Sequence, residues 1–377
     1  MRMHLKTYKR PQQPNEMKER TPTNCHEWEN NFSAYDNMKK TSSVKENSEG
    51  ANKKKYGFSS NQIPEVFRTP FIVSGYRRPG LTFWECIRSL LRSSNETINV
   101  WSHLLALVLF VSVNMTSLPT TDPFFLPLIS FAVGISVLYL MSSSAHLFNC
   151  MSEDSHRICF FFDYAAIGFY TFTAGQAMFF YSRTAGASAW AVHDSLTVFQ
   201  SISTFFSFFI TFLCCASNHP RCKDYKALLR VGVLAVNWLV ITSPYTVRIL
   251  LCENADPAYN RISTVYFKRH VVFCGLGAAL YAARVPERLM AGVFDNFGQS
   301  HNLAHILIAM GIQQAFNAAQ VDLQERRSAL LDRFSSQPTL MNTVGVAMFV
   351  LFGHVAIVLW CAGKLRSVKH KSESINN

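Results

Sequence analysis

Long apolar segments alternate with short polar ones through most of the chain, as far as residue 363. Each segment is close to the roughly 20 residues that an α-helix needs to cross the hydrocarbon layer of a bilayer. The pattern therefore predicts an all-α integral membrane protein with eight spans. The sixth and seventh of these spans contain the most polar residues. The predicted spans are 100–118, 123–141, 158–181, 197–216, 228–247, 265–285, 300–318 and 341–363.

Polar residues are concentrated at the two ends of the chain. Residues 1–62 contain Lys53-Lys54-Lys55 and many Asn, Ser, Glu and Gln residues. Apolar content this low does not offset the entropy that a backbone loses on ordering, which predicts a disordered, basic, cytosolic tail. Residues 364–377 form a second basic tail.

The middle of the chain divides into three further parts. Residues 63–99 form a juxtamembrane segment, in which Thr82-x-x-Glu85 is a capping-box pattern and predicts a short helix lying on the membrane. An unstructured segment is the alternative. Residues 100–318 are the seven-span core, and residues 319–363 are a loop and an eighth span.

Composition and charge narrow the class of protein. Hydrophobic residues make up 49% of the chain and charged residues only 16%. The net charge of +12 is better explained by a membrane surface than by nucleic acid, because the basic residues are not interleaved with aromatic ones on a soluble module. The ten cysteines lie mostly in or beside spans, which favours buried, reduced thiols over disulfides.

The orientation in the membrane is predicted from the two ends. The connections on the two sides of the membrane contain nearly equal numbers of lysine and arginine residues. Arginines precede the first span, however, and the last span is followed by Lys364, Arg366, Lys369 and Lys371. An even number of spans keeps both ends inside, as the positive-inside rule prefers. No apolar signal-peptide core occurs in the first 60 residues, so we expect the first span to direct insertion.

Four ionisable residues lie at or just inside the ends of predicted spans. His301 and His305 are four residues apart and so share one face of a helix. His146 ends the second span on the side where the seventh begins, and Asp163 lies near the start of the third. Such groups are costly in a bilayer, so a shared role is expected. A zinc ion bound by three histidines, with its fourth position open, is typical of catalytic sites. Taken singly, each histidine could instead be a core residue that only makes hydrogen bonds.

Two further side chains are candidates for chemistry at such a zinc site. Zinc lowers the pKa of a bound water toward 7, and Asp163 could accept its proton or hold it by a hydrogen bond. Ser142, one turn before His146, could donate to a reacting carbonyl or orient an imidazole. Serines are common beside helix ends, however, and Ser143 and Ser144 are equally placed.

Five motifs in this order resemble the progestin and adipoQ receptor family over residues 70–318. They are Asn95-Glu-Thr-Ile-Asn-Val-Trp-Ser-His103, Ser142-x-x-x-His146, Asp163 seventeen residues later, Ala283-Arg-Val-Pro-Glu-Arg288 and Ser300-His301-x-x-x-His305. Ser74-Gly-Tyr-Arg-Arg78, Asp163-Tyr-Ala-Ala and the eighth span are more similar to the membrane progestin receptor branch.

The resemblance implies a seven-helix adiponectin-receptor-like bundle plus an eighth transmembrane helix, with a cytosolic amino terminus. It implies zinc near the cytosolic face, bound by His146, His301 and His305, with Asp163 beside the metal-bound water. Adiponectin receptors look like ceramide-cleaving hydrolases, whereas the membrane progestin receptor branch looks like plasma-membrane steroid receptors coupled to G proteins.

Three functions are therefore open. The first is a receptor for a steroid or related lipid in which zinc ties three helices together. The second is a zinc-dependent, ceramidase-type amidohydrolase in which Asp163 and Ser142 are catalytic. The third is a transporter or channel in which the same polar residues line a proton path. The motifs name no ligand-binding residue, because shape selectivity for a lipid depends on many apolar contacts.

Overall fold

The protein is described here by a computed structural model, which covers residues 55–115, 118–119, 121–184, 191–219, 222, 225–252, 261–333 and 337–375. Most of the predicted amino-terminal tail, residues 1–54, lies outside this part of the chain. Within the described residues the fold is all-α, and its one β feature is an isolated bridge between Phe58 and Tyr76.

Eight long helical segments among the described residues coincide with the eight predicted spans. Their bounds are α3 Thr97–Phe110 continued by η3 Val111–Met115, η4 Pro123–Phe125 continued by α4 Leu126–Phe148, α5 Glu153–Ser182, α7 Leu196–Ala216, α8 Lys226–Cys252, α9 Arg261–Ala283, α10 Ser300–Glu325, and η6 Met341–Gly345 continued by α12 Val346–Ile375. Shorter helices connect them, namely η1 Ser60–Gln62, η2 Glu65–Phe67, α2 Phe83–Ser89, α6 Ala191–Asp194 and α11 Arg327–Arg333.

Six of these segments in the described ranges are both long enough and apolar enough to cross a membrane. The other two, α9 and α10, are long enough but more polar, as the sequence indicated for the sixth and seventh spans. Lys268 and Arg269 interrupt α9, and His301, His305 and Gln313 interrupt α10. The chain is thus an all-α integral membrane protein, with a seven-helix bundle and an eighth transmembrane helix.

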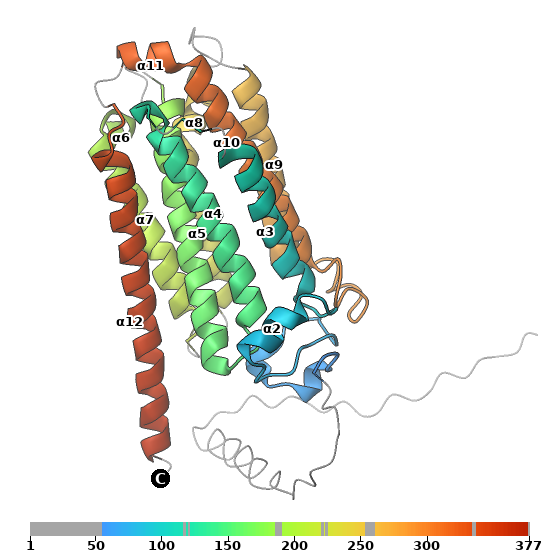
Figure 1. The fold of residues 1–377 in the computed structure, drawn as a ribbon. Helices are drawn as coiled ribbons and strands as arrows, with labels where there is room; N and C mark the ends of the chain where they lie inside the picture. Colours follow the sequence, from blue (N-terminus) through green and yellow to red (C-terminus); the bar gives the residue numbers. More distant parts are fainter. Residues whose placement is uncertain are drawn as a thin grey trace, which may run out of the picture. The chain divides into compact units, whose positions relative to one another are not determined.

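Helix α5 lies at the centre of the bundle and packs on α4, α7, α8 and α12 (Figure 1). Two-thirds of its apolar stretch, 67%, is buried within the protein, against 28% for α3 and for α12. Its Phe172 and Phe179 are completely buried. Because α5 is covered by protein on most sides, it can carry the carboxylate of Asp163 without exposing it to lipid.

Helix α12 is attached to α5 and α7, on the opposite side of the bundle from α9 and α10 (Figure 1). Its His354 accepts or donates hydrogen bonds at both ring nitrogens, with Ser207 Oγ at 3.2 Å and Thr211 Oγ1 at 2.8 Å. A Cβ at Gly353 would lie 2.3 Å from Phe208 Cζ, so any larger residue at position 353 would have to displace the Phe208 ring.

Residues 55–96 and the connection 284–299 lie at one end of the bundle. The predicted capping box forms at the start of α2, where the Thr82 N–H donates to Glu85 Oε2 at 2.9 Å. Residues 55–62, which the sequence placed in the tail, include η1 and the strand partner of Tyr76. Free thiols are found at Cys86, Cys150, Cys159, Cys214, Cys215, Cys222, Cys274 and Cys361.

Candidate metal centre

Two of the three histidines lie on the first turns of α10, and the start of this helix is fixed by Glu287. The Glu287 carboxylate accepts hydrogen bonds from the Ser300 N–H, at 2.7 Å, and from the Ser300 hydroxyl. An acidic group at a helix amino terminus satisfies free N–H groups and interacts favourably with the helix dipole. Glu287 is therefore the cap of α10.

The imidazoles of His146, His301 and His305 meet at this end of the bundle, and they can offer nitrogens that all lie within 4.8 Å of one another. His146 Nε2 is 3.1 Å from His301 Nε2, which is 3.2 Å from His305 Nε2. Two nitrogens on one tetrahedral zinc ion, at bonds of about 2.0–2.1 Å, would be about 3.3 Å apart. These two separations are close to that value, so the three histidines could hold a metal ion.

The protonation of His146 is determined by Glu96, the residue before α3. His146 Nδ1 lies 2.7 Å from Glu96 Oε2, and a carboxylate only accepts, so Nδ1 carries the proton and Nε2 keeps its lone pair for a metal. The same carboxylate accepts from Asn99 Nδ2 at 2.8 Å and from Asn149 Nδ2 at 3.0 Å. Glu96 is thus the outer partner that metal-binding histidines commonly have.

His305 is held from the side of α3. Its Nδ1 lies 3.2 Å from Ser102 Oγ, and its ring stacks on that of His103 with centroids 4.0 Å apart. Asn302, on the same turn as His301, donates to Asn99 Oδ1 at 2.7 Å. Helix α3 therefore positions α10, the helix that carries two of the three candidate metal ligands.

Asp163 and Ser142, the two residues predicted for catalysis, lie beside the histidines. Both are buried, and the Ser142 hydroxyl is a hydrogen-bonding neighbour of the Asp163 carboxylate, which interacts electrostatically with His146. Asp163 is not one of the three converging donors. A carboxylate in this place could hold a water or substrate atom next to the metal, or it could act only as a buried charge partner.

Arg77, which belongs to the Ser74-Gly-Tyr-Arg-Arg78 motif but was assigned no role from the sequence, holds the end of α4 on which His146 lies. Its guanidinium donates to the carbonyl oxygens of His146 and Leu147, at 2.6 and 2.8 Å, and to Asn149 Oδ1 at 2.8 Å. These carbonyls belong to the last turn of a helix, where no backbone donor remains for them. Arg77 therefore fixes the backbone of one candidate ligand, His146, and, through Asn149, the carboxylate of Glu96.

The neighbouring Ser74 joins the same end of the bundle to the connection before α10. Its N–H and hydroxyl both donate to Asp295 Oδ2 at 2.7 Å. Gly75 has a φ of +82°, and a Cβ there would lie 1.9 Å from Asn296 Oδ1. Ser74 through Arg77 thus contact both the end of α4 and the connection that precedes α10.

Known proteins are similar to this chain over most of its length. The sequence model of the family described as Haemolysin-III related matches residues 91–315, which include all three histidines and Asp163. Membrane progestin receptor gamma-A of Danio rerio is 32% identical over 339 residues, covering 84% of this chain and 97% of its own length. Membrane progestin receptor gamma of Homo sapiens is 31% identical, covering 84% and 97%. Membrane progestin receptor delta of Mus musculus is 31% identical, covering 79% and 88%.

Proposed function

The chain belongs to the haemolysin-III-related family of progestin and adipoQ receptors, and we propose that it is a membrane receptor for a steroid of the progestin class or a related lipid. In this proposal zinc is bound by His146, His301 and His305 near the cytosolic face. Its role is to tie α4 to α10 beside α5. A ligand that changes the packing of these helices changes the surface that the receptor presents to a partner.

The convergence of the three Nε2 atoms carries this proposal. His146 and His305 are buried and His301 is half-buried, and His146 is oriented by Glu96 so that its lone pair faces the other two rings. The ligands come from two helices, and the two on α10 are 155 and 159 residues beyond His146 in the sequence, so a bound ion would connect distant parts of the bundle. When bound, zinc supplies a Lewis acid and a rigid cross-link.

We further propose that the protein lies in the plasma membrane with its amino terminus in the cytosol and that G proteins are its partners. The basic residues at both ends of the chain support this orientation. Residues 55–96 and the carboxyl end of α12 lie at the same end of the bundle, as an even number of spans requires (Figure 1). The proposed zinc site is at that end.

Metal analysis combined with ligand binding tests the receptor proposal. Purified protein should contain about one zinc per chain, and His301→Ala and His305→Ala should each lose it. His354→Ala is the matched control, because it also removes a buried imidazole but one on α12. Radiolabelled progesterone should bind the wild type and His354→Ala. Protein that contains no zinc, or binds progestins no better than unrelated sterols, would refute the proposal.

The alternative is a zinc-dependent, ceramidase-type amidohydrolase, which the position of Asp163 favours. A buried carboxylate beside three converging imidazoles, with a serine hydroxyl as its neighbour, is suited to moving a proton during attack on an amide. In this alternative Ser142 would orient the carboxylate or donate to the amide carbonyl.

The substitution Asp163→Asn distinguishes the two functions, because it removes the base while keeping the shape of the side chain. A receptor would keep its zinc and its steroid affinity, and lipid extracts would show unchanged sphingosine. An amidohydrolase would keep its zinc but lose ceramide turnover by a factor of about 10² to 10⁴, the usual contribution of a general base.

A further inference from the structure

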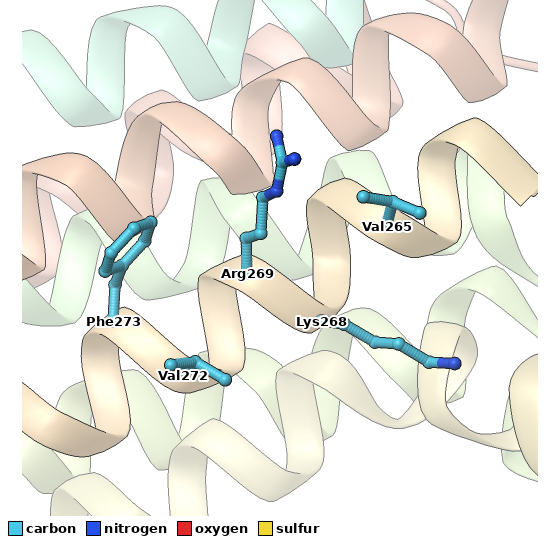
Figure 2. Close-up of a pocket in the computed structure, with 5 residues that line it drawn as sticks. All are labelled: Val265, Lys268, Arg269, Val272 and Phe273. Atoms are coloured by element: carbon cyan, nitrogen blue, oxygen red, sulfur yellow. The ribbon is translucent and has the colours of Figure 1, made fainter.

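Two hollows among the described residues differ in how they are built. The larger one, of about 250 Å³, is formed by a single stretch of α9, and Figure 2 shows Lys268 and Arg269 extending to different sides of that helix. These two cations therefore do not converge on one ligand. The smaller hollow, of about 20 Å³, lies next to the metal centre and is enclosed by several segments of the chain. Its lining includes Arg77, Glu96 and Cys150.

The thiols of Cys86 and Cys150 are in contact beside this smaller hollow. Their Sγ atoms are 3.7 Å apart, although 64 residues separate the two cysteines in the sequence. Cys86 lies in the middle of α2 and is completely buried, whereas Cys150 follows the end of α4 and is 5% exposed. A disulfide joins sulfurs about 2.05 Å apart, so a movement of roughly 1.6 Å would bring these two into bonding distance.

The backbone holds the two cysteines in this arrangement. The Gly80 N–H donates to the Cys150 carbonyl at 2.9 Å, and the Cys86 N–H donates to the Thr82 carbonyl at 2.9 Å. Leu81, Val100 and Leu147 belong to the same buried apolar cluster as both thiols. Because cysteine side chains are short, the position of the backbone determines the distance between the sulfurs.

The two thiols differ in access and in acidity. The smaller hollow reaches Cys150 but not Cys86, and a hollow of this size admits a water-sized molecule. The hydrogen bond from the Cys86 thiol, and then the positive charge of Arg77, lowers the pKa of the Cys150 thiol below its usual value. The thiolate is the form of cysteine that reacts with peroxides. Cys150 is therefore the cysteine that a small oxidant reaches first, and Cys86 is placed to react with it afterwards.

We propose that Cys86 and Cys150 form a reversible disulfide when the protein is exposed to hydrogen peroxide. The Cys150 thiolate attacks one peroxide oxygen, so that an S–O bond forms, the O–O bond breaks, and the leaving hydroxide takes up the proton that the thiol had released. The Cys86 thiol then attacks the Cys150 sulfur, so that the S–S bond forms and the S–O bond breaks. The second hydroxide leaves with the proton of Cys86 as water. Two thiols are thus oxidised, one peroxide is reduced to two waters, and a thiol reductant reverses the reaction.

The disulfide joins the juxtamembrane segment covalently to the end of α4. Arg77 spans the same two parts, because it donates to Ser89 Oγ on α2 at 3.1 Å and to the carbonyl oxygen of His146 at 2.6 Å. Oxidation therefore changes the spacing of the groups that Arg77 connects. With the orientation proposed above, both thiols face a reducing cytosol, where disulfides are usually transient and serve redox sensing. The site goes beyond the proposed function and depends on neither zinc nor a steroid.

Disulfide mapping of the purified full-length protein tests the proposal. After treatment with hydrogen peroxide and denaturation in iodoacetamide, mass spectrometry should find the peptides of Cys86 and Cys150 joined to each other. Dithiothreitol should separate them. This measurement uses the wild type alone, so it stands whether or not a cysteine variant folds. The proposal is overturned if both cysteines are still alkylated after peroxide, or if either is joined to a different cysteine or to another chain.

Cysteine variants test the order of the two steps. Dimedone, which traps sulfenic acids, should label Cys150 in Cys86→Ser, because the second thiol is missing. In Cys150→Ser it should leave Cys86 unlabelled, because the smaller hollow does not reach that thiol. The matched control is Cys215→Ser, which removes a buried thiol that lies in one apolar cluster with Cys361 and should form the disulfide as fully as the wild type. Dimedone on Cys86 rather than Cys150, or loss of the disulfide in Cys215→Ser, would contradict the proposal.

Discussion

Replacing Glu96 by glutamine should weaken zinc binding without removing any ligand. In the wild type the Glu96 carboxylate accepts three hydrogen bonds, from His146 Nδ1, Asn99 Nδ2 and Asn149 Nδ2. A glutamine has one oxygen and one NH₂ group, so one of these donors would face another donor. Rotating the Asn149 amide would not relieve the clash, because Asn149 Oδ1 already accepts from Arg77.

The size of the effect follows from what the carboxylate does. The Glu96 carboxylate fixes the proton of His146 on Nδ1. In Glu96→Gln the amide NH₂ can instead donate to Nδ1. The imidazole proton then lies on Nε2, where it blocks metal binding. Loss of such an outer partner usually weakens metal affinity 10- to 100-fold, or about 1.4 to 2.7 kcal/mol. Glu96→Ala should lie at the upper end of this range, because it also leaves Asn99 and Asn149 without an acceptor.

Competition with a chelator of known zinc affinity measures the dissociation constant in purified protein. Glu85→Gln is the matched control, because it makes the same change in a glutamate that pairs with Lys55 and Thr82 and has no contact with His146. The reasoning would be refuted if Glu96→Gln bound zinc as tightly as the wild type. It would equally be refuted if Glu85→Gln weakened binding to the same degree.

Three further predictions concern the ends and the edge of the bundle. Arg77→Gln should lower the free energy of unfolding by about 3 kcal/mol in detergent titrations, because it leaves buried carbonyls at the end of α4 without a donor. Gly353→Leu should displace α12 from Phe208, seen as faster proteolysis of α12, yet leave zinc content unchanged because the histidines lie on other helices. The hydrogen bond from Lys55, and then that from the Thr82 N–H, lowers the pKa of Glu85 from 4.5 to about 2. Since the folded pKa is the lower one, this pairing stabilises the fold above pH 4.5 and is lost as the pH falls toward 2, which amide exchange at residue 55 and its neighbours should report.

The positions of the long helices were predictable because each helix corresponds to one continuous run of mostly apolar residues. The same is true of α2, whose Thr82 and Glu85 are three residues apart, and of the pair His301 and His305 on one helical face. Bringing His146 to this pair required only the rule that successive spans alternate in direction. Burial in the membrane and helical periodicity thus determine most of the fold and the candidate metal donors.

The partners of these donors were not predictable, because they are hydrogen bonds between residues far apart in the sequence. Glu96 and His146 are 50 residues apart, Arg77 and Asn149 are 72 apart, and Ser74 and Asp295 are 221 apart. No periodicity connects such pairs. The cap of α10 is of the same kind, since the folded chain brings Glu287 to Ser300, 13 residues later.

The separation of the metal donors along the chain has a consequence for biosynthesis. His301 leaves the ribosome 155 residues after His146, which at the usual rates of translation is a delay of about 8 to 30 s. During that interval the first donor is already inserted and already oriented, since Glu96 and Arg77 precede it in the chain. In the proposed zinc site, metal capture would therefore be a late event of assembly, and a nascent chain arrested before α10 should insert its first spans yet retain no zinc.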